Sequence, residues 1–259
     1  MKKFELTTET KINIFGKKLF RIKALISFGP ISAGEKGGWV EKEENLSQSG
    51  NAWVSGNAEV SGNAEVSGNA EVSGNAEVSG NAYVRDNACV RDNACVRGNA
   101  CVCDNACVCD NACVRGNACV CDNACVCDNA CVRGNACVCD NACVCDNACV
   151  RGNAMVSGNA EVSGDAWVRD NAWVRGNAWV RGNAWVRGNA DYTTIHGFGT
   201  QFRTTTFFRC KDKEIRVSCG CFFGTISEFR EQVKRTRKGK VAEEYLMIAD
   251  LMEKHFKEE

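Results

Sequence analysis

Histidine, the commonest general base and metal ligand of active sites, is nearly missing from this sequence. Only two histidines occur among 259 residues, His196 and His255, and both lie outside the long central repeat. Neither has a nucleophile or an acidic residue placed to act with it, so no nucleophile–base arrangement can be drawn. We therefore expect that the protein is not an enzyme.

The sequence also lacks net charge and long apolar runs. Lys+Arg and Asp+Glu both total 32, which gives no reason to expect a nucleic acid or a membrane as a partner. No apolar stretch approaches the length that spans a bilayer, and the first residues, Met1 to Glu5, lack the apolar core of a signal peptide. These absences predict a cytoplasmic protein.

A short repeat fills the middle of the chain. The hexad N-A-x-V-x-[GD] runs from Asn51 to Gly188, and Asp165 is the only departure at its first position. Within each hexad, A-x-V-x alternates, so Ala and Val point to one side of a short strand and the two variable residues to the other. The Gly/Asp–Asn pair tolerates left-handed backbone and turns the chain. Three strands and three corners make one triangular coil of 18 residues, and coils stack about 4.8 Å apart.

On these residues the chain resembles the hexapeptide-repeat family, the left-handed parallel β-helices, over residues 51–194, or about eight coils. Its N-A-x-V-x-G hexads are similar to those of uncharacterised repeat proteins from bacteria and their phages. The resemblance implies an all-β solenoid. Many family members are acyltransferases with a histidine between coils and a long interrupting loop. The repeats here contain neither, so the resemblance implies no activity.

The two flanking segments are predicted to cap the solenoid, whose ends would otherwise expose unpaired strand edges. Residues 1–50 are expected to form a small N-terminal β cap, and residues 195–259 a C-terminal cap with a β-hairpin and two helices. The expected elements are strands over 11–15 and 19–24 in the first cap, strands over 204–210 and 215–219 in the second, and helices that start near Ser227 and cover 241–256.

Cysteine occupies the outward positions of the middle coils. Between Asn99 and Gly152, NACVCDNACVCDNACVRG occurs three times without a change. The first face of the rod is predicted to carry three C-x-C pairs, Cys101/Cys103, Cys119/Cys121 and Cys137/Cys139. The second face is predicted to carry another three, Cys107/Cys109, Cys125/Cys127 and Cys143/Cys145. We expect these twelve cysteines to bind a metal cofactor.

The third face is predicted to combine one cysteine column with one arginine column. The cysteines are Cys95, Cys113, Cys131 and Cys149, and the arginines are Arg97, Arg115, Arg133 and Arg151. We expect the arginines to lower the pKa of these thiols. The four cysteines, together with Cys89 at the head of the second face, are secondary candidates for metal ligands. Three further cysteines, Cys210, Cys219 and Cys221, are interpreted as packing residues of the C-terminal cap.

The sulfur spacing decides between the uses of these thiols. Thiols two residues apart on a strand should lie about 6.7 Å apart, and those on successive coils about 4.8 Å apart. Structural disulfides are not expected, because parallel side chains hold Cβ atoms near 4.8 Å whereas a relaxed bridge needs about 3.8 Å. A cytosolic protein is also kept reduced.

Dense cysteine in a reducing compartment is typical of soft-metal binding. The expected rectangle of sulfurs is too wide for one tetrahedral zinc ion, which needs sulfurs roughly 3.8 Å apart. A polynuclear centre fits better, and we expect iron–sulfur clusters for electron transfer or storage, with Cu(I) or Zn thiolates as the alternatives. Because one face offers every ligand from one side, a second chain would complete the shell, which predicts a homodimer through the cysteine faces.

Two other interpretations stay open for the rod and its surface. Repeat duplication could have copied cysteines that have no ligand, which would make the protein a structural scaffold. Ice binding is set aside, since the repeats contain no threonine. A separate band, Trp167, Trp173, Trp179 and Trp185, each with an arginine two residues later, could dock a partner or simply stabilise the sheets.

Overall fold

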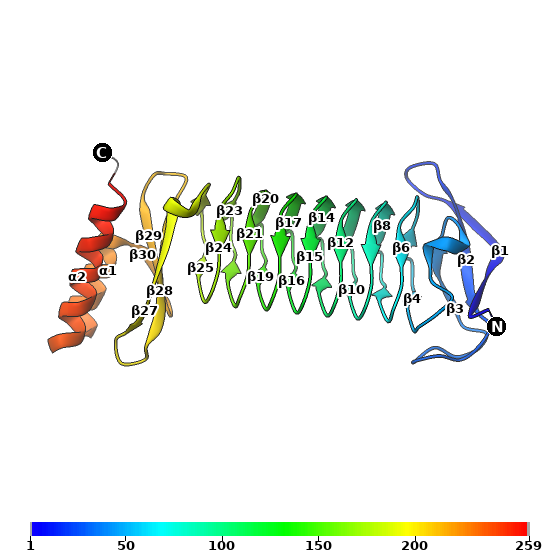
Figure 1. The fold of residues 1–259 in the computed structure, drawn as a ribbon, viewed down its shortest axis with the longest axis horizontal. Helices are drawn as coiled ribbons and strands as arrows, with labels where there is room; N and C mark the ends of the chain where they lie inside the picture. The colour runs from blue at the N-terminus through cyan, green and yellow to red at the C-terminus, as the bar shows by residue number, and fades with distance from the viewer. Residues whose placement is uncertain (1, 258–259) are drawn as a thin grey trace.

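The computed structural model describes residues 2–257 as a rod that is capped at both ends (Figure 1). Short parallel strands stack along the rod in about eight coils, which confirms the predicted β-solenoid. Strands 18 residues apart pair in register, so that Val102 lies opposite Val120 and Cys101 opposite Cys119. Three sheets, one for each face, therefore run the length of the rod.

Each face is one sheet of very short strands. The first face comprises β6 (Glu65–Val66), β9 (Tyr83–Val84), β12 (Cys101–Val102), β15 (Cys119–Val120), β18 (Cys137–Val138), β21 (Met155–Val156) and β24 (Trp173–Val174). The second face comprises β4 (Trp53–Val54), β7 (Glu71–Val72), β10 (Cys89–Val90), β13 (Cys107–Val108), β16 (Cys125–Val126), β19 (Cys143–Val144), β22 (Glu161–Val162) and β25 (Trp179–Val180). The third face comprises β5 (Glu59–Val60), β8 (Glu77–Gly80), β11 (Cys95–Gly98), β14 (Cys113–Gly116), β17 (Cys131–Gly134), β20 (Cys149–Gly152), β23 (Trp167–Val168) and β26 (Trp185–Val186).

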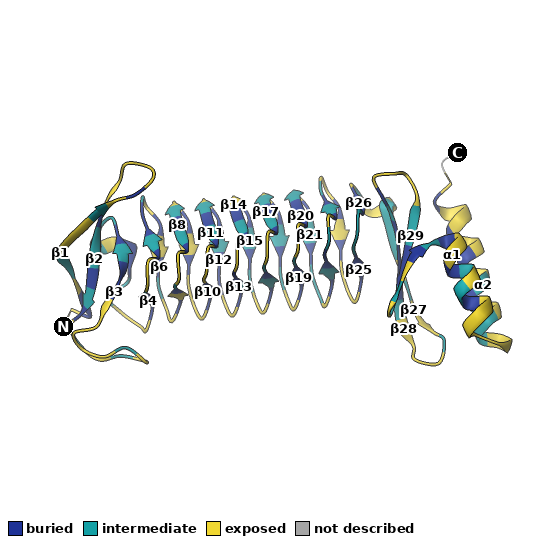
Figure 2. Cartoon of the chain, turned by 180° about the vertical axis from the view of Figure 1, so that it is seen from behind, coloured by how far each residue is buried: buried dark blue, intermediate teal, exposed yellow. Residues whose placement is uncertain are grey.

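The core of the rod consists of the repeated alanines and valines. From Ala52 to Val186, every hexad alanine and valine is at most 1% exposed. Figure 2 shows this buried lining inside the coils and the exposed corners between them. Full burial of a valine side chain stabilises a fold by roughly 1.5–3 kcal/mol, so a core of these two residue types suffices for a regular stack. The predicted inward phase of Ala and Val is confirmed.

The corners combine left-handed backbone with ladders of asparagine side chains. The residue before each corner asparagine has positive φ, as at Asp104 (60°) and Gly116 (78°). From Asn51 to Asn159, each corner asparagine amide donates to the side chain 18 residues later, as from Asn105 Nδ2 to Asn123 Oδ1 at 3.0 Å, and the acceptor is asparagine except at Asp165. Because these bonds repeat at 18-residue spacing, they lock neighbouring coils in register at all three edges of the rod.

The N-terminal cap extends the sheet of the third face. It consists of β1 (Phe4–Ile12), β2 (Lys18–Ala24), β3 (Lys36–Val40) and the 3₁₀ turn η1 (Glu43–Asn45), and β3 pairs in parallel with β5. The first strand begins and ends earlier than predicted. It ends at Ile12 because Asn13 Oδ1 accepts the backbone N–H groups of Phe15 and Lys17 and holds a turn there.

The C-terminal cap is a four-stranded antiparallel sheet covered by two helices. Its strands are β27 (Tyr192–Phe198), β28 (Arg203–Arg209), β29 (Ile215–Cys219) and β30 (Phe222–Thr225), and β27 follows the 3₁₀ turn η2 (Asn189–Asp191). The predicted hairpin corresponds to β28 and β29, whereas β27 and β30 were not predicted. The sheet therefore begins at Tyr192, inside the segment assigned to the solenoid.

The two predicted helices are present with shifted starts. Helix α1 (Ile226–Thr236) begins after Thr225, whose hydroxyl accepts the N–H of Glu228 in a capping box. Helix α2 (Gly239–His255) begins two residues before, and ends one residue before, the predicted range of 241–256. Within residues 2–257, neither helix combines the length and the apolar character that crossing a membrane requires.

Candidate metal centre

The twelve cysteines of the C-x-C pairs form two arrays on the surface of the rod. The first array, on the first face, contains Cys101, Cys103, Cys119, Cys121, Cys137 and Cys139. The second array, on the second face, contains Cys107, Cys109, Cys125, Cys127, Cys143 and Cys145. Strand pairing places the leading cysteines of successive coils directly opposite each other.

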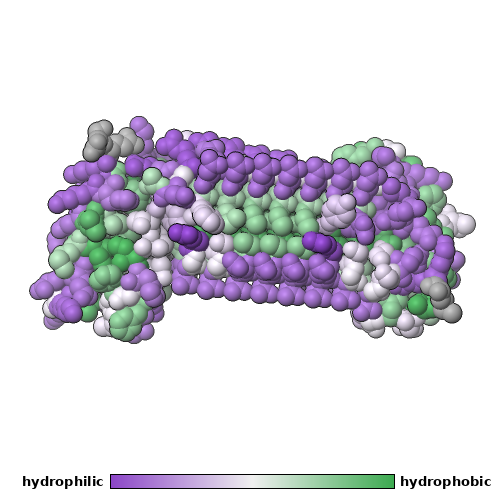
Figure 3. Space-filling view, viewed as in Figure 1, coloured by the Kyte–Doolittle hydropathy of each residue, from purple (hydrophilic) through white to green (hydrophobic). Residues whose placement is uncertain are grey.

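The surface view agrees with this placement. A hydrophobic stripe runs along the rod between two hydrophilic rows (Figure 3). The alanines and valines of the coils are buried. Cysteine is therefore the residue that gives the middle coils an apolar surface, and the asparagines and aspartates of the corners border it.

Within the arrays, sulfur atoms gather in groups of three. In each group all three Sγ atoms lie within 4.8 Å of one another. The groups are Cys101/Cys103/Cys119, Cys119/Cys121/Cys137, Cys107/Cys109/Cys125 and Cys125/Cys127/Cys143. Such groups could hold a metal ion, because three sulfurs, once deprotonated, lie close enough together to act as ligands of one ion.

The two sulfurs of one C-x-C pair are therefore closer than the predicted 6.7 Å. That value is the rise of two residues along an extended strand. Here β12 ends at Val102, and Cys103 already begins the corner that Asp104 completes with positive φ. The extended spacing consequently does not apply to the second cysteine of a pair, and the rectangle of sulfurs becomes a set of compact triangles.

Two thiols of the second column are shielded from solvent. Cys103 and Cys109 are only 5% and 6% exposed, whereas Cys121, Cys127, Cys139 and Cys145 are half-buried. Burial raises the pKa of Cys103, and the neighbouring carboxylate of Asp104 raises it further. The pKa of Cys109 is raised for the same two reasons, with Asp110 as its neighbour. At neutral pH these groups are thiols, so a metal ion must displace their protons when it binds.

Aspartate columns run beside both arrays, and the sequence interpretation gave them no part in the site. Asp122 Oδ2 accepts the backbone N–H of Asp140 at 3.3 Å, and Asp146 Oδ2 accepts that of Gly164 at 2.8 Å. One mixed group, Asp128/Cys145/Asp146, has ligand atoms within 4.8 Å of one another. The signal was visible in the sequence, because aspartate follows all six C-x-C pairs of the repeat, whereas most other hexads end in glycine.

The third face has the predicted columns but a different electrostatic arrangement. The pKa of Cys131 is lowered, because it accepts hydrogen bonds from the thiols of Cys113 and Cys149 and lies near Arg115 and Arg133. The pKa of Cys113 is raised, because its proton is held between neighbouring sulfurs. The predicted lowering of the thiol pKa is therefore confirmed at Cys95 and Cys131 and wrong at Cys113 and Cys149. The column alternates thiols of low and high pKa.

The secondary candidates do not join the sulfur groups. Among residues 2–257, no compact group of three potential ligand atoms includes Cys89, Cys95, Cys113, Cys131 or Cys149. On the third face the second outward position carries arginine, so each coil offers one sulfur in place of two. The two C-x-C faces are therefore the candidate metal centre.

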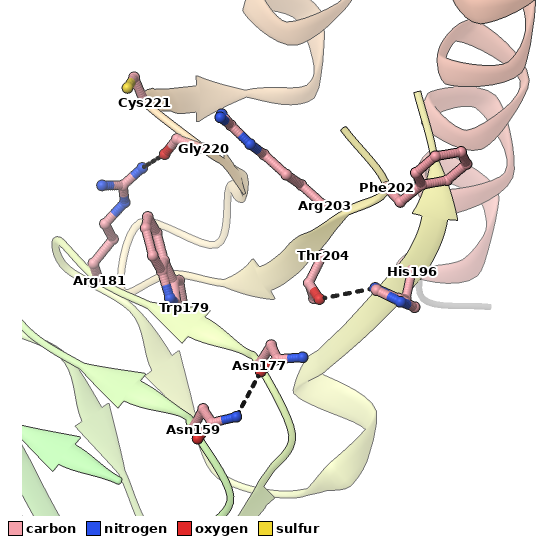
Figure 4. Close-up of a pocket in the computed structure, with 10 residues that line it drawn as sticks. All are labelled: Asn159, Asn177, Trp179, Arg181, His196, Phe202, Arg203, Thr204, Gly220 and Cys221. Atoms are coloured by element: carbon pink, nitrogen blue, oxygen red, sulfur yellow. Dashed lines mark hydrogen bonds between the residues drawn. The ribbon is translucent and has the colours of Figure 1, made fainter. Parts of the chain in front are cut away.

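A cavity at the C-terminal end of the rod was not predicted. It measures about 760 Å³ and is lined by Trp179 of the rod and by His196, Arg203 and Cys221 of the cap (Figure 4). Cys221 is exposed, so its interpretation as a packing residue is wrong, whereas Cys210 is buried as predicted. The lining residues come from separate strands that only the folded cap brings together.

All 20 cysteines of the sequence lie in the described part of the chain and are free thiols. The search with protein-family models and the search of curated proteins both end without a match. The resemblance to the hexapeptide-repeat family therefore stays a prediction. The function is inferred from the positions of the sulfur atoms.

Proposed function

We propose that this protein binds soft metal ions through the first and second arrays. The observation that carries the proposal is the set of four sulfur triangles, each with all Sγ atoms within 4.8 Å. Thiolates are the preferred ligands of soft ions such as Cu(I), of zinc and of iron–sulfur clusters. Three thiolates at one point on a rigid sheet need little rearrangement to bind such an ion.

The pattern of substitution supports a ligand for these thiols. Cysteine occupies only outward positions, while the inward Ala and Val never change across the cysteine-bearing coils. Exposed free thiols are otherwise a liability, because they oxidise and cross-link. A scaffold with unliganded thiols is the competing function, since the three identical coils are also what recent duplication would produce.

Iron–sulfur clusters for electron transfer or storage are one form of this proposal. Such a cluster is held by four cysteine thiolates. Each triangle supplies three sulfurs from one side, so a fourth ligand has to come from another coil or from a second chain. The cluster form and the homodimer through the cysteine faces are thus linked proposals, and zinc in tetrahedral coordination has the same need for a fourth ligand.

Metal and acid-labile sulfide analysis after anaerobic purification tests the proposal. We expect stoichiometric soft metal, and iron with an equal amount of sulfide would identify clusters. Protein without metal is then incubated under reducing conditions with Cu(I), with Zn²⁺, and with iron plus sulfide. If the protein retains none of the three, the proposal is overturned and the scaffold function remains.

The matched control is a protein whose first array is changed to serine at Cys101, Cys103, Cys119, Cys121, Cys137 and Cys139. Serine keeps the size of the side chain and removes the soft donor. This variant should lose the metal of one face and keep that of the second array. Equal metal content in both proteins would place the bound metal elsewhere.

A further inference from the structure

The sulfur triangles of each array share atoms. Cys119 belongs both to the triangle with Cys101 and Cys103 and to the triangle with Cys121 and Cys137. On the second face, Cys125 has the same double membership. An ion in one triangle and an ion in the next would therefore be bound to the same sulfur, and that thiolate would bridge them.

Resting on the proposed metal binding, we infer that each array binds a continuous, thiolate-bridged chain of monovalent soft cations, with Cu(I) as the representative ion. The chain follows a zigzag between the two sulfur columns. On the first face its sulfurs are Cys101, Cys103, Cys119, Cys121 and Cys137, in that order. On the second face they are Cys107, Cys109, Cys125, Cys127 and Cys143.

The distances suit an ion with few ligands. A metal–thiolate bond is about 2.3 Å long, so two thiolates on opposite sides of one ion lie about 4.6 Å apart. Each pair of sulfurs within a triangle lies within 4.8 Å, a limit that includes this separation. A tetrahedral ion needs four sulfurs, each about 3.8 Å from the others, whereas each triangle offers three. The closed-shell ion Cu(I) accepts two or three thiolates, so a triangle can complete its coordination.

Charge favours a monovalent ion in a chain of this kind. Each thiol loses its proton to solvent when its sulfur binds the ion, and no electrons are transferred. With one ion between each two consecutive sulfurs, four monovalent ions face five thiolates in each array, so the charges nearly balance along the rod. Divalent ions at the same occupancy would leave excess positive charge in each array.

The chain also needs no ligand from outside the array. A cluster core must be surrounded by its thiolates, whereas the zigzag lies flat on a sheet that presents all its sulfurs from one side. A single copy of the protein can therefore complete the coordination. This separates the inferred chain from cluster binding, which needs a further ligand.

The test compares the shared sulfurs with sulfurs at one end of each chain. The shared-sulfur variant is Cys119→Ser with Cys125→Ser, and the matched control is Cys101→Ser with Cys107→Ser. Each control residue belongs to one triangle and ends its chain, so it binds one ion, whereas each shared residue binds two and joins the two halves of the chain. The reduced, full-length proteins are titrated anaerobically with Cu(I) against a competing chelator, and X-ray absorption measures Cu–S and Cu–Cu scattering.

We expect the unchanged protein to bind Cu(I) as a monomer, with cooperative filling and short Cu–Cu vectors. The shared-sulfur variant should lose about twice as many ions as the control and lose most Cu–Cu scattering. Equal losses in the two variants, or Cu(I) without Cu–Cu scattering, would overturn the chain and leave metal binding intact. Binding of iron and sulfide in place of Cu(I) would also overturn the chain and leave metal binding intact. Retention of no soft metal at all would overturn the proposed function itself, and far-UV circular dichroism confirms that both variants are folded.

Discussion

The C-x-C faces and the third face of this rod share parallel in-register stacking and the same Ala/Val core, yet they present different chemistry. On the first and second faces the second outward residue is cysteine and the corner is aspartate, as at Cys103 and Asp104. On the third face these positions are arginine and glycine, as at Arg115 and Gly116. The outward residues therefore set the surface chemistry while the inward residues hold the scaffold.

The difference shows what a second column of thiols adds. One column alone gives a row of hydrogen-bonded thiols whose pKa values alternate, because neighbouring sulfurs share protons. Two columns give triangles of sulfur that can surround an ion from one side. Two hexad positions, the second outward residue and the corner residue, thus distinguish the proton-sharing row from the candidate metal centre.

The largest expected effect comes from a change in the core that all three faces share. Val120→Asp places a carboxylate in a site that is 0% exposed and has no partner for it. We expect a loss of several kcal/mol of stability, and with it the loss of metal binding on every face. Thermal unfolding followed by circular dichroism measures the effect. The neighbouring outward change, Cys119→Ser, is the control and should leave the melting curve nearly unchanged.

The next largest effect should come from a third array built on the third face. Arg97, Arg115 and Arg133 are changed to cysteine, and Gly98, Gly116 and Gly134 to aspartate, so that the face repeats the C-x-C-D pattern. We expect the protein to bind about half as much metal again, because a third set of triangles joins the two that exist. Metal content per chain is the measurement.

A control for the third array carries only the three glycine-to-aspartate changes. It keeps one cysteine column and should bind no additional metal. If the cysteine variant also gains none while remaining folded, then two columns of thiols are insufficient, and the contrast between the faces lies in some other feature.

Loss of one array should have a smaller effect than the changes above, because the fold is kept. The serine variant of the first array should retain about half of the bound metal and the far-UV spectrum of the unchanged protein. Unfolding would mean that these cysteines support the core, in contradiction to their outward position. Metal analysis and circular dichroism on the same sample separate the two results.

The smallest effect is expected for the arginines of the third face. Arg133→Gln removes a positive charge beside Cys131, whose pKa is lowered in part by Arg115 and Arg133. The pKa of that thiol should rise from about 3, so the pH at which its alkylation reaches half of the maximal rate should shift upward. Peptide mapping after timed alkylation at a series of pH values measures this midpoint for Cys131. Arg175→Gln, in the tryptophan band, should leave the midpoint unchanged.

The sequence predicted the columns of cysteine but not the triangles of sulfur atoms. The period of 18 residues places Cys101 over Cys119, since strand pairing in a regular stack leaves no other register. It could not place the sulfur of Cys103, because that depends on where the strand gives way to the corner. The alternation of thiol pKa between Cys113 and Cys131 could not be predicted either, because it depends on which thiol donates a hydrogen bond to which sulfur.

In the caps, the sequence likewise failed to predict some boundaries and pairings of strands and helices. The turn at Asn13 and the helix start at Thr225 depend on side chains that bond to nearby backbone, and they shifted the predicted boundaries by a few residues. The pairing of β27 with β28 joins Tyr192 to Phe208 across a loop. No periodic pattern marks that pairing, so the four-stranded sheet and the cavity beside it were not predicted.

The sequence by itself determined the solenoid, its inward Ala/Val core and the face on which each cysteine lies, because a strict short repeat allows only one phase and one register. The tertiary structure decided how closely the sulfurs approach, which protons they share, and how the ends of the rod are closed. Those properties depend on side-chain directions at corners and on contacts between segments far apart in the chain. Local pattern does not encode these contacts, and the packed structure fixes them.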